Sequence, residues 1–211
     1  MIYQINPKEI EEKSMKIISD LLGSHDWPPL KKAIIHRIVH TSGDPDYANW
    51  IEIHPQAIEA GINALKAGCQ IITDVQMVAT GINKNALNKL GVESKCFLNE
   101  PEVREVAQKT GETRSMTAFK LAEKKLDGNI IAIGNAPTAL FTLLELCKTK
   151  KIKPALIIGT PVGFVGAKES KELLMAEAPV PFITVRGTKG GSPIAAAIIN
   201  ALTYSLVERN D

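Results

Sequence analysis

Short apolar segments alternate with longer amphipathic segments along most of this chain. The apolar segments are rich in isoleucine and are bounded by glycine, asparagine or aspartate, which is the pattern of buried strands. The segments between them repeat their apolar residues at helical spacing. Buried strands are therefore predicted at residues 69–74, 129–134, 155–160 and 182–187, and the segment SKCFL at residues 94–98 is strand-like.

Helices are predicted in the intervals between these strands and before the first of them. Short buried strands that alternate with helices are typical of a parallel sheet covered on both faces. We therefore predict an α/β fold of the three-layer, doubly wound type, with a mainly parallel five-stranded sheet and added N-terminal helices. No repeat or linker divides the chain, which predicts a single domain over residues 1–211. The helices are expected at 7–22, 28–42, 54–66, 114–126, 137–147, 167–176 and 193–207.

The segment RIVHTSGD, residues 37–44, ends the second predicted helix with a histidine shortly before a glycine turn. The polar side of this helix carries His36, Arg37 and His40. A helix C-terminus has partial negative charge, which stabilises an imidazolium. His40 is therefore a candidate proton donor near neutral pH. A solvated polar face that happens to end in histidine fits the same pattern.

Ser14 interrupts the apolar stripe of the first predicted helix, whose start is marked by Asn6 as the cap and Pro7 in the first turn. A serine in this position can bond a backbone carbonyl one turn back. It can also direct its hydroxyl at a ligand. The sequence leaves both interpretations open.

Four predicted strands are followed by turns rich in glycine, proline, threonine or serine: TDVQMVATG, GNAPTAL, GTPVGFVGAKESKE and RGTKGGSP. Ligands of an open parallel sheet bind beyond the carboxyl ends of its strands. Exposed amides at helix N-termini make such turns good anion receptors, although tight connections use the same residue types. No dinucleotide fingerprint or P-loop is present, so a carboxylate is favoured over a phosphate. Basic residues in or beside turns or helix ends are Arg37, Arg114, Lys168, Arg186 and Lys189.

Arg114 stands in the first turn of a predicted helix, where a cation opposes the helix dipole. A bound anion would offset that unfavourable interaction. A side chain that simply points into water is the alternative, and the sequence does not separate the two.

Composition excludes several classes of function. A net charge of +2 and an aromatic content of 5% argue against nucleic acid as a partner. No stretch is long and apolar enough for a membrane span, and no secretory segment is expected at the polar N-terminus. Cys69, Cys96 and Cys147 are read as reduced thiols of a cytoplasmic protein. His36 and His40 lack the glutamate expected in a paired zinc motif, so no bound metal is predicted.

Taken together, these motifs resemble the precorrin-8X methylmutase family, including its cobalt-precorrin-8 form. The resemblance covers nearly the whole chain in matching order. Thr188 is one departure, because relatives often carry a basic residue there, and this removes one possible carboxylate partner. The matching segments are IEEKSMKII (10–18), RIVHTSGD, ITDVQMV (72–78), TRS (113–115), IGNAPTAL, GTPVGFVGAKESKE and VRGTKGGSPIAAAIINAL.

The resemblance implies an isomerase that moves a methyl group from C-11 to C-12 of a polycarboxylate corrinoid in cobalamin biosynthesis. It also implies a homodimer with its site near the subunit interface, and no organic cofactor or protein-bound metal. By motif position, His40 is the catalytic residue. The candidate substrate-binding residues are Ser14, Arg37, Thr41, Asp44, Thr73, Met77, Arg114, Ser115, Asn135, Thr138, Gly159, Gly163, Phe164, Lys168, Arg186, Lys189, Gly190 and Ser192.

Two other functions fit the predicted sheet and its turns. A nucleotide-dependent α/β enzyme would use the same turns, but the nucleotide fingerprints are missing. A non-catalytic tetrapyrrole-binding protein would need the basic residues and not a titrating histidine.

Overall fold

The computed structural model describes residues 5–207, and its centre is a six-stranded sheet. The strand order is β1-β6-β5-β4-β2-β3, and every neighbouring pair is parallel except β1 and β6. The α/β class with a mostly parallel sheet is thus confirmed. The strands are β1 (Ile51–Ile53), β2 (Gln70–Thr73), β3 (Glu93–Cys96), β4 (Ile130–Ile133), β5 (Leu156–Gly159) and β6 (Phe182–Val185).

The strand count is where the sequence prediction was wrong. All five predicted strands are present, but β1 adds a sixth at the edge, antiparallel to β6 with Ile51 opposite Val185. β1 is only three residues long and half-buried. A segment this short carries no readable alternation, so hydrophobic periodicity could not reveal it.

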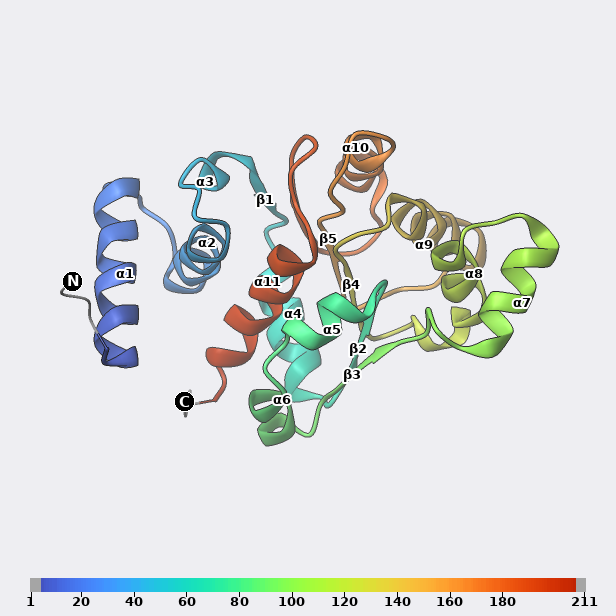
Figure 1. Ribbon diagram of the computed structural model, residues 1–211, viewed down its shortest axis with the longest axis horizontal. Helices are drawn as coiled ribbons and strands as arrows, with labels where there is room; N and C mark the ends of the chain where they lie inside the picture. The colour runs from blue at the N-terminus through green and yellow to red at the C-terminus, as the bar shows by residue number, and fades with distance from the viewer. Residues whose placement is uncertain (1–4, 208–211) are drawn as a thin grey trace.

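Helices cover the sheet along its length (Figure 1). The sequence prediction missed four of them, α3, α5, α6 and α7, each ten residues or shorter. The described helices are α1 (Pro7–Leu22), α2 (Pro29–Ser42), α3 (Tyr47–Trp50), α4 (Ala57–Lys66), α5 (Gln76–Gly81), α6 (Lys84–Leu90), α7 (Pro101–Thr110), α8 (Arg114–Leu121), α9 (Pro137–Lys150), α10 (Ala167–Glu177) and α11 (Ser192–Tyr204), with a 3₁₀ turn at Glu123–Lys125.

The side chains of β4 show how the sheet supports two apolar cores. Ile130 and Ala132 point into a core shared with α2, α4 and α11, whereas Ile131 and Ile133 point into a core shared with α8, α9 and α10. All four are fully buried. Successive side chains of a strand alternate between faces, so a run of isoleucines fills both cores at once.

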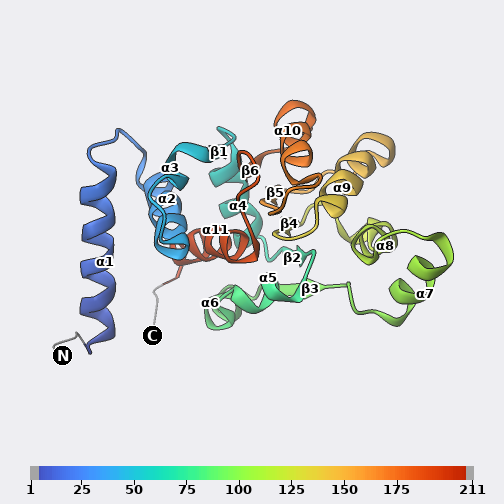
Figure 2. The same cartoon turned by 45° about the horizontal axis from the view of Figure 1, so that its top comes forward.

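The N-terminal helices lie at one end of the molecule (Figure 2). α2 packs against α11, and α1 packs against α2. Ile18 of α1 is buried, whereas Ile10, Ile17 and Leu21 on the adjacent part of the helix surface are 45%, 50% and 62% exposed. α1 is therefore attached to the body through one face only. Among residues 5–207, none of the helices has both the length and the apolar character that crossing a membrane requires.

Candidate functional site

A cavity of about 540 Å³ lies beyond the carboxyl ends of β5 and β6. We call it the ligand cavity. Its walls come from the end of α2, the β5–α10 loop, the β6–α11 loop (residues 186–191) and the start of α11. Elements far apart in sequence meet here because α2 packs against α11. The lining residues are Thr41, Ser42, Asp44, Tyr47, Val162, Gly163, Phe164, Thr188, Lys189, Gly190, Pro193 and Ile194.

His40 lies in the last turn of α2, one residue before this cavity wall begins, and is exposed to solvent. The helix ends as the sequence predicts: Gly43 adopts a left-handed conformation, and its N–H donates to the carbonyl of Val39 at 2.9 Å. The Nδ1 atom of His40 lies 3.1 Å from the Oγ of Ser14. This contact leaves the Nε2 side of the ring free of any partner within residues 5–207.

The structure does not show the first of the two sequence interpretations of Ser14, a bond to a carbonyl of its own helix. Its hydroxyl instead contacts the histidine ring of α2, and a contact with a ligand stays a prediction. A second contact joins the same helices, because Arg37 pairs with Glu11 at 3.1 Å and lies 5.3 Å from the ring centre of Tyr204. The polar face of α2 is thus held by α1 on one side and by α11 on the other.

Lys189 and Asp44 form an ion pair across the mouth of the ligand cavity, with 2.6 Å between Nζ and Oδ2. The hydrogen bond from Lys189 is the main cause that lowers the pKa of the Asp44 carboxyl. The same ammonium lies 4.0 Å from the ring centre of Trp50, a cation–π distance. These contacts fix the Lys189 side chain beside the cavity while keeping it partly exposed.

The β6–α11 loop approaches the end of β5 very closely. The N–H of Gly191 donates to the carbonyl of Thr160 at 2.7 Å, and the N–H of Gly163 donates to the carbonyl of Thr188 at 3.1 Å. Gly190 has a φ of +148° at this contact. Glycine is required there because the backbone conformation and the close approach both exclude a side chain.

Asp74 corrects the expectation that the GNAPTAL turn is open to a ligand. This carboxylate is 1% exposed and accepts three backbone hydrogen bonds, from Gly134, Asn135 and Ala136, at 2.7–3.0 Å. Burial raises its pKa, and the three amide donors oppose that rise. The anion receptor at the N-terminus of α9 therefore exists, but a carboxylate of the protein itself occupies it.

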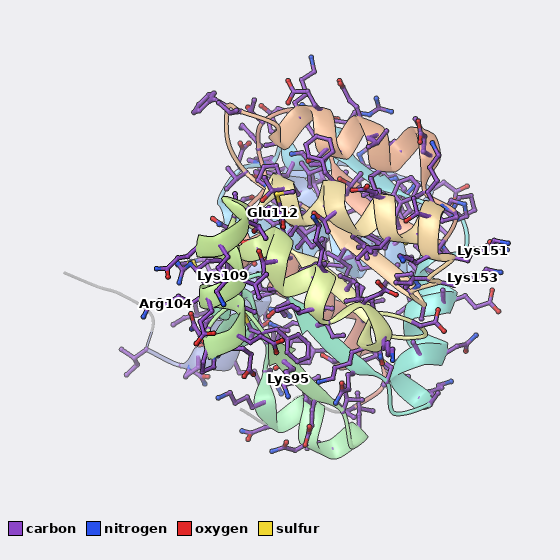
Figure 3. The ribbon with its side chains drawn as sticks, turned by 90° about the vertical axis from the view of Figure 1, so that its right-hand side faces the viewer. Lys95, Arg104, Lys109, Glu112, Lys151 and Lys153 are labelled. Atoms are coloured by element: carbon purple, nitrogen blue, oxygen red, sulfur yellow. The ribbon has the colours of Figure 1, made fainter. Side chains whose placement is uncertain are left out.

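A second group of candidates meets where α8 and α9 begin. Thr113 caps α8 by accepting from the N–H of Met116, and its hydroxyl lies 3.0 Å from that of Thr138. Arg114 follows, is exposed, and borders a cavity of about 380 Å³ together with Arg104 of α7. Figure 3 shows Arg104 and Lys109 extending from α7 at this side of the molecule. Ser115 follows Arg114, and Asn135 lies three residues before Thr138, so the contact between Thr113 and Thr138 brings the two segments that carry these four candidates together.

Two candidates expose large apolar side chains at the carboxyl edge of the sheet. Met77, in the first turn of α5 after β2, is 67% exposed, and Phe164, in the β5–α10 loop, is 93% exposed. Val165 beside Phe164 is 89% exposed. Of these three residues, Phe164 lines the ligand cavity. Apolar side chains exposed to this degree at the carboxyl edge of the sheet suit a flat apolar ligand surface.

Several sequence candidates lie outside the cavity surface. Thr73 and Ser192 are 1% and 5% exposed, and the hydrogen of Gly159 faces Leu174, where a Cβ would come within 2.7 Å. Strand ends and the start of α11 are packed here against the core, so these three positions serve packing.

Two basic candidates have carboxylate partners within the protein. Arg186 pairs with Glu52 at 2.6 Å, and Lys168 lies 3.7 Å from Glu172 on the exposed side of α10.

Sequence reasoning missed Lys171, which is fully buried and donates from Nζ to the backbone carbonyl of Lys189 at 2.5 Å. Burial lowers the pKa of Lys171 to about 8. A signal was available, because Lys171 falls on the apolar stripe of α10 with Ala167, Ser170 and Leu174. A lysine on such a stripe is unusual and indicates a specific partner. Within the described part of the chain, no group of three or more metal-ligating side chains comes together.

Comparison with known proteins gives one consistent result. The family model for precorrin-8X methylmutase matches residues 9–205. The chain is 44% identical to the cobalt-precorrin-8 methylmutase of Priestia megaterium over 199 residues, which cover 94% of this chain and 88% of that protein. It is 46% identical to the precorrin-8X methylmutase of Pseudomonas aeruginosa over 167 residues, 79% of this chain and 80% of that protein. The solved structure of precorrin-8X methylmutase from Thermus thermophilus superposes with a TM-score of 0.85 at 39% identity, covering 93% of this chain and 94% of that one.

Proposed function

The chain belongs to the precorrin-8X methylmutase family, and from this premise we propose how its residues carry out the reaction. It is an isomerase that moves a methyl group within the corrinoid ring system during cobalamin biosynthesis. In the finer proposal, the substrate is precorrin-8X or its cobalt form, and the methyl group moves from C-11 to the adjacent C-12. Such a 1,5-shift needs neither a nucleophile nor a hydride carrier.

His40 is the proposed general acid. A proton donated to the conjugated macrocycle makes the ring more electron-poor and eases methyl migration, and the same group recovers the proton afterwards. The observation that carries this role is the 3.1 Å contact between Ser14 Oγ and His40 Nδ1, which orients the ring from one side. The Nε2 atom is left to face the substrate. One general acid contributes about 10²–10⁴-fold to a rate.

The remaining acceleration comes, in this proposal, from holding the macrocycle in one reactive shape. Lys189 and the β6–α11 loop receive one peripheral carboxylate, and Arg114 receives another at the start of α8. Two facts support these assignments: Lys189 lies at the mouth of the ligand cavity, and Arg114 is exposed at a helix N-terminus. Arg37 keeps the α1 and α2 helices together through Glu11, which places it beside the acid.

The exposed apolar side chains of Met77 and Phe164 form the proposed cover for the face of the ring. A tetrapyrrole-derived ligand has a broad apolar face and an acidic rim. The apolar side chains and the basic residues at this edge of the sheet match that division.

The test is the variant His40→Ala, assayed by the absorption change that accompanies conversion of the substrate. Substrate should bind with an affinity within about threefold of wild type, whereas turnover should fall by about 10²–10⁴-fold. His25→Ala is the matched control, because His25 is exposed and its ring stacks on Trp27. Near-normal turnover of His40→Ala would remove His40 from the role. Binding by the wild-type protein without any conversion would favour a non-catalytic carrier instead.

Supplying metal-free precorrin-8X and cobalt-precorrin-8 side by side tests the substrate form. The macrocycle itself would hold the cobalt, so we expect the same residues to bind both. The ratio of kcat/KM for the two substrates assigns the natural one.

At the level of the whole chain, we propose a single three-layer, doubly wound domain over residues 1–211 that acts as a cytoplasmic homodimer. Helices on both faces of the sheet support the layering. The exposed isoleucines and leucine on the outer side of α1 support a subunit interface there. α1 also carries Ser14, so an interface on α1 would lie close to His40, as the family resemblance implies.

A further inference from the structure

Lys171 is the one lysine that the fold buries completely among residues 5–207. It lies in the middle of α10, on the side that packs inward with Ala167, Ser170 and Leu174. An ammonium is hard to desolvate, and a methionine would fill the same space without that penalty. No carboxylate within residues 5–207 lies within salt-bridge distance of it. Neither packing nor an ion pair therefore explains why a lysine occupies position 171.

The partner of Lys171 is the carbonyl oxygen of Lys189, at 2.5 Å from Nζ. Neighbouring carbonyls of the β6–α11 loop are held in the same manner. The carbonyl of Thr188 accepts from the N–H of Gly163 at 3.1 Å, and the carbonyl of Gly190 accepts from the hydroxyl of Tyr47 at 3.4 Å. Three successive carbonyls thus have donors supplied by other elements of the protein.

The amide groups of this loop have a different environment. No cis peptide occurs among the described residues, so each N–H points opposite to the carbonyl that precedes it. The N–H groups of Lys189 and Gly190 therefore point away from the atoms that hold the carbonyls of Thr188 and Lys189. Neither amide donates to an acceptor within residues 5–207. Both residues line the ligand cavity.

We propose that Lys171 is a positioning residue that fixes the Lys189–Gly190 peptide, so that its amide and the Lys189 ammonium receive one carboxylate of the substrate. Lys171 acts from beneath the loop and does not touch the ligand. The identification of that carboxylate with a peripheral acid of the corrinoid rests on the proposed function. The orientation of the loop itself does not.

The orientation of the loop can be measured without substrate, because the Lys189 ammonium lies 4.0 Å from the ring of Trp50. In a Trp27→Phe background, Trp50 is the single tryptophan and its emission reports where Lys189 sits. We expect Lys171→Met to shift the Trp50 emission in the same direction as Lys189→Met. Lys148→Met is the control, because Lys148 is an exposed lysine on the neighbouring helix α9. Emission of Lys171→Met equal to that of the Lys148→Met control would overturn the proposal.

Steady-state kinetics test the consequence for the ligand. We expect Lys171→Met to raise KM by about tenfold with kcat changed less than threefold. Its melting temperature should be at or above that of wild type, because methionine carries no charge that has to be desolvated. Lys171→Gln retains an N–H donor and should have a KM between those of wild type and Lys171→Met. A melting temperature that falls while KM stays at the wild-type value would assign Lys171 to stability alone and overturn the proposal.

A double-mutant cycle separates positioning from an unrelated effect. If Lys171 acts through the loop that carries Lys189, the KM of the double variant Lys171→Met/Lys189→Met should rise by less than the product of the two single increases. A rise equal to that product would contradict the proposal. Should Lys171→Met not fold, Lys171→Gln decides alone through its KM and its Trp50 emission, and wild-type values of both would overturn the proposal. Absence of conversion by the wild-type protein would instead reject the proposed function and leave the emission result standing.

Discussion

A methyl group on the α-carbon of Gly190 would stand 2.3 Å from the carbonyl oxygen of Thr160. The clash is with backbone at the end of β5, which cannot rotate away as a flexible side chain could. At a φ of +148°, a side chain would also be strained in its own right. The position of the β6–α11 loop over the sheet therefore depends on having glycine, which has no side chain, at residue 190.

Gly190→Ala should accordingly displace the loop and raise KM by at least about tenfold, equivalent to about 1.4 kcal/mol of binding free energy. Gly187→Ala is the matched control in the same loop. Gly187 has a φ of +72° and open space around its α-carbon, so only about 1–2 kcal/mol of backbone strain should appear in the free energy of unfolding. Substrate titration and urea denaturation of both variants measure the two effects. Equal KM values for the two variants would refute the close-approach argument.

Lys171 predicts a specific dependence of stability on pH. Its pKa is about 8 in the folded protein, against 10.5 for an ordinary lysine. Between these values the unfolded chain holds a proton that the folded chain has released, so the free energy of unfolding rises with pH across this window. The gain is at most about 3–4 kcal/mol, at about 1.4 kcal/mol for each pKa unit.

Urea denaturation of wild type and Lys171→Met from pH 7 to pH 10.5 measures this contribution. Burial also raises the pKa values of Cys69 and Cys147 to about 11, so their titration contributes to the pH dependence of stability. Both proteins contain these cysteines, so their contribution disappears when the free energy of unfolding of one protein is subtracted from that of the other. A difference that stays flat across this range would show that Lys171 titrates normally.

The two lysines of the AKESK segment show what residue types can and cannot predict. Lys168 was the sequence candidate because it stands at a helix N-terminus, yet its nearest charged partner is Glu172 in the next turn. Lys171, one turn later, is the residue that holds the cavity loop. Both are lysines near glycine, and only the direction in which α10 presents them separates the two roles. The side of α10 on which each lysine lies relative to the core follows from how the helix packs. The identity of the residues alone does not give this information.

At the scale of elements, Asp74 ties three parts of the fold together. It ends β2, and its two oxygens accept from the turn that links β4 to α9. The sequence reasoning identified this turn as an anion receptor and identified Asp74 as the end of a strand. It could not join the two, because only the β2–β4 pairing places the carboxylate beside the turn.

Asp74→Asn should lower the free energy of unfolding by about 2–4 kcal/mol, because an amide N–H₂ would face one or two of the three backbone donors. Asp46→Asn is the control, since Asp46 is exposed and its side chain caps nothing at the start of α3, and it should change stability by less than about 0.5 kcal/mol. Chemical denaturation at pH 7 compares them. A loss for Asp74→Asn no larger than that of the control would mean that the three hydrogen bonds contribute little.

The strand β1 marks the limit of periodicity at this scale. β2, β4 and β5 were predictable because each is an isoleucine-rich, buried run whose side chains enter both cores. β1 has three half-buried residues and owes its existence to pairing with β6. Pairing of β1 with β6 places Trp50 beside Lys189 and Glu52 beside Arg186. No local pattern in the sequence predicts these two contacts.

At the scale of the whole molecule, the site depends on contacts that α2 makes with α1 and α11, the first and last described helices. Ser14 near the start reaches His40, and Arg37 lies against Tyr204 near the end. The sequence predicted that ligands would gather at the carboxyl edge of the sheet, and the ligand cavity lies there. It could not predict that α1 would carry Ser14 to the histidine, because a lone serine on an apolar stripe has two equally good explanations.

The proposed homodimer is tested on the outer side of α1. Ile17→Glu combined with Leu21→Glu should convert a dimer to a monomer in light scattering coupled to gel filtration, because both side chains are at least half exposed there. Leu121→Glu provides the control, as an exposed leucine on α8 at the opposite end of the molecule (Figure 1). A protein that is monomeric before mutation, or a dimer that persists in the double variant, would place the interface elsewhere or exclude it.

The carboxylate of Asp74 has a practical consequence for anyone designing inhibitors. An acidic group of an inhibitor directed at the start of α9 would compete with the Asp74 carboxylate, which is buried and already accepts the backbone hydrogen bonds there. Anionic substituents of an inhibitor are therefore better directed at the N–H groups of Lys189 and Gly190, which donate to no acceptor within residues 5–207.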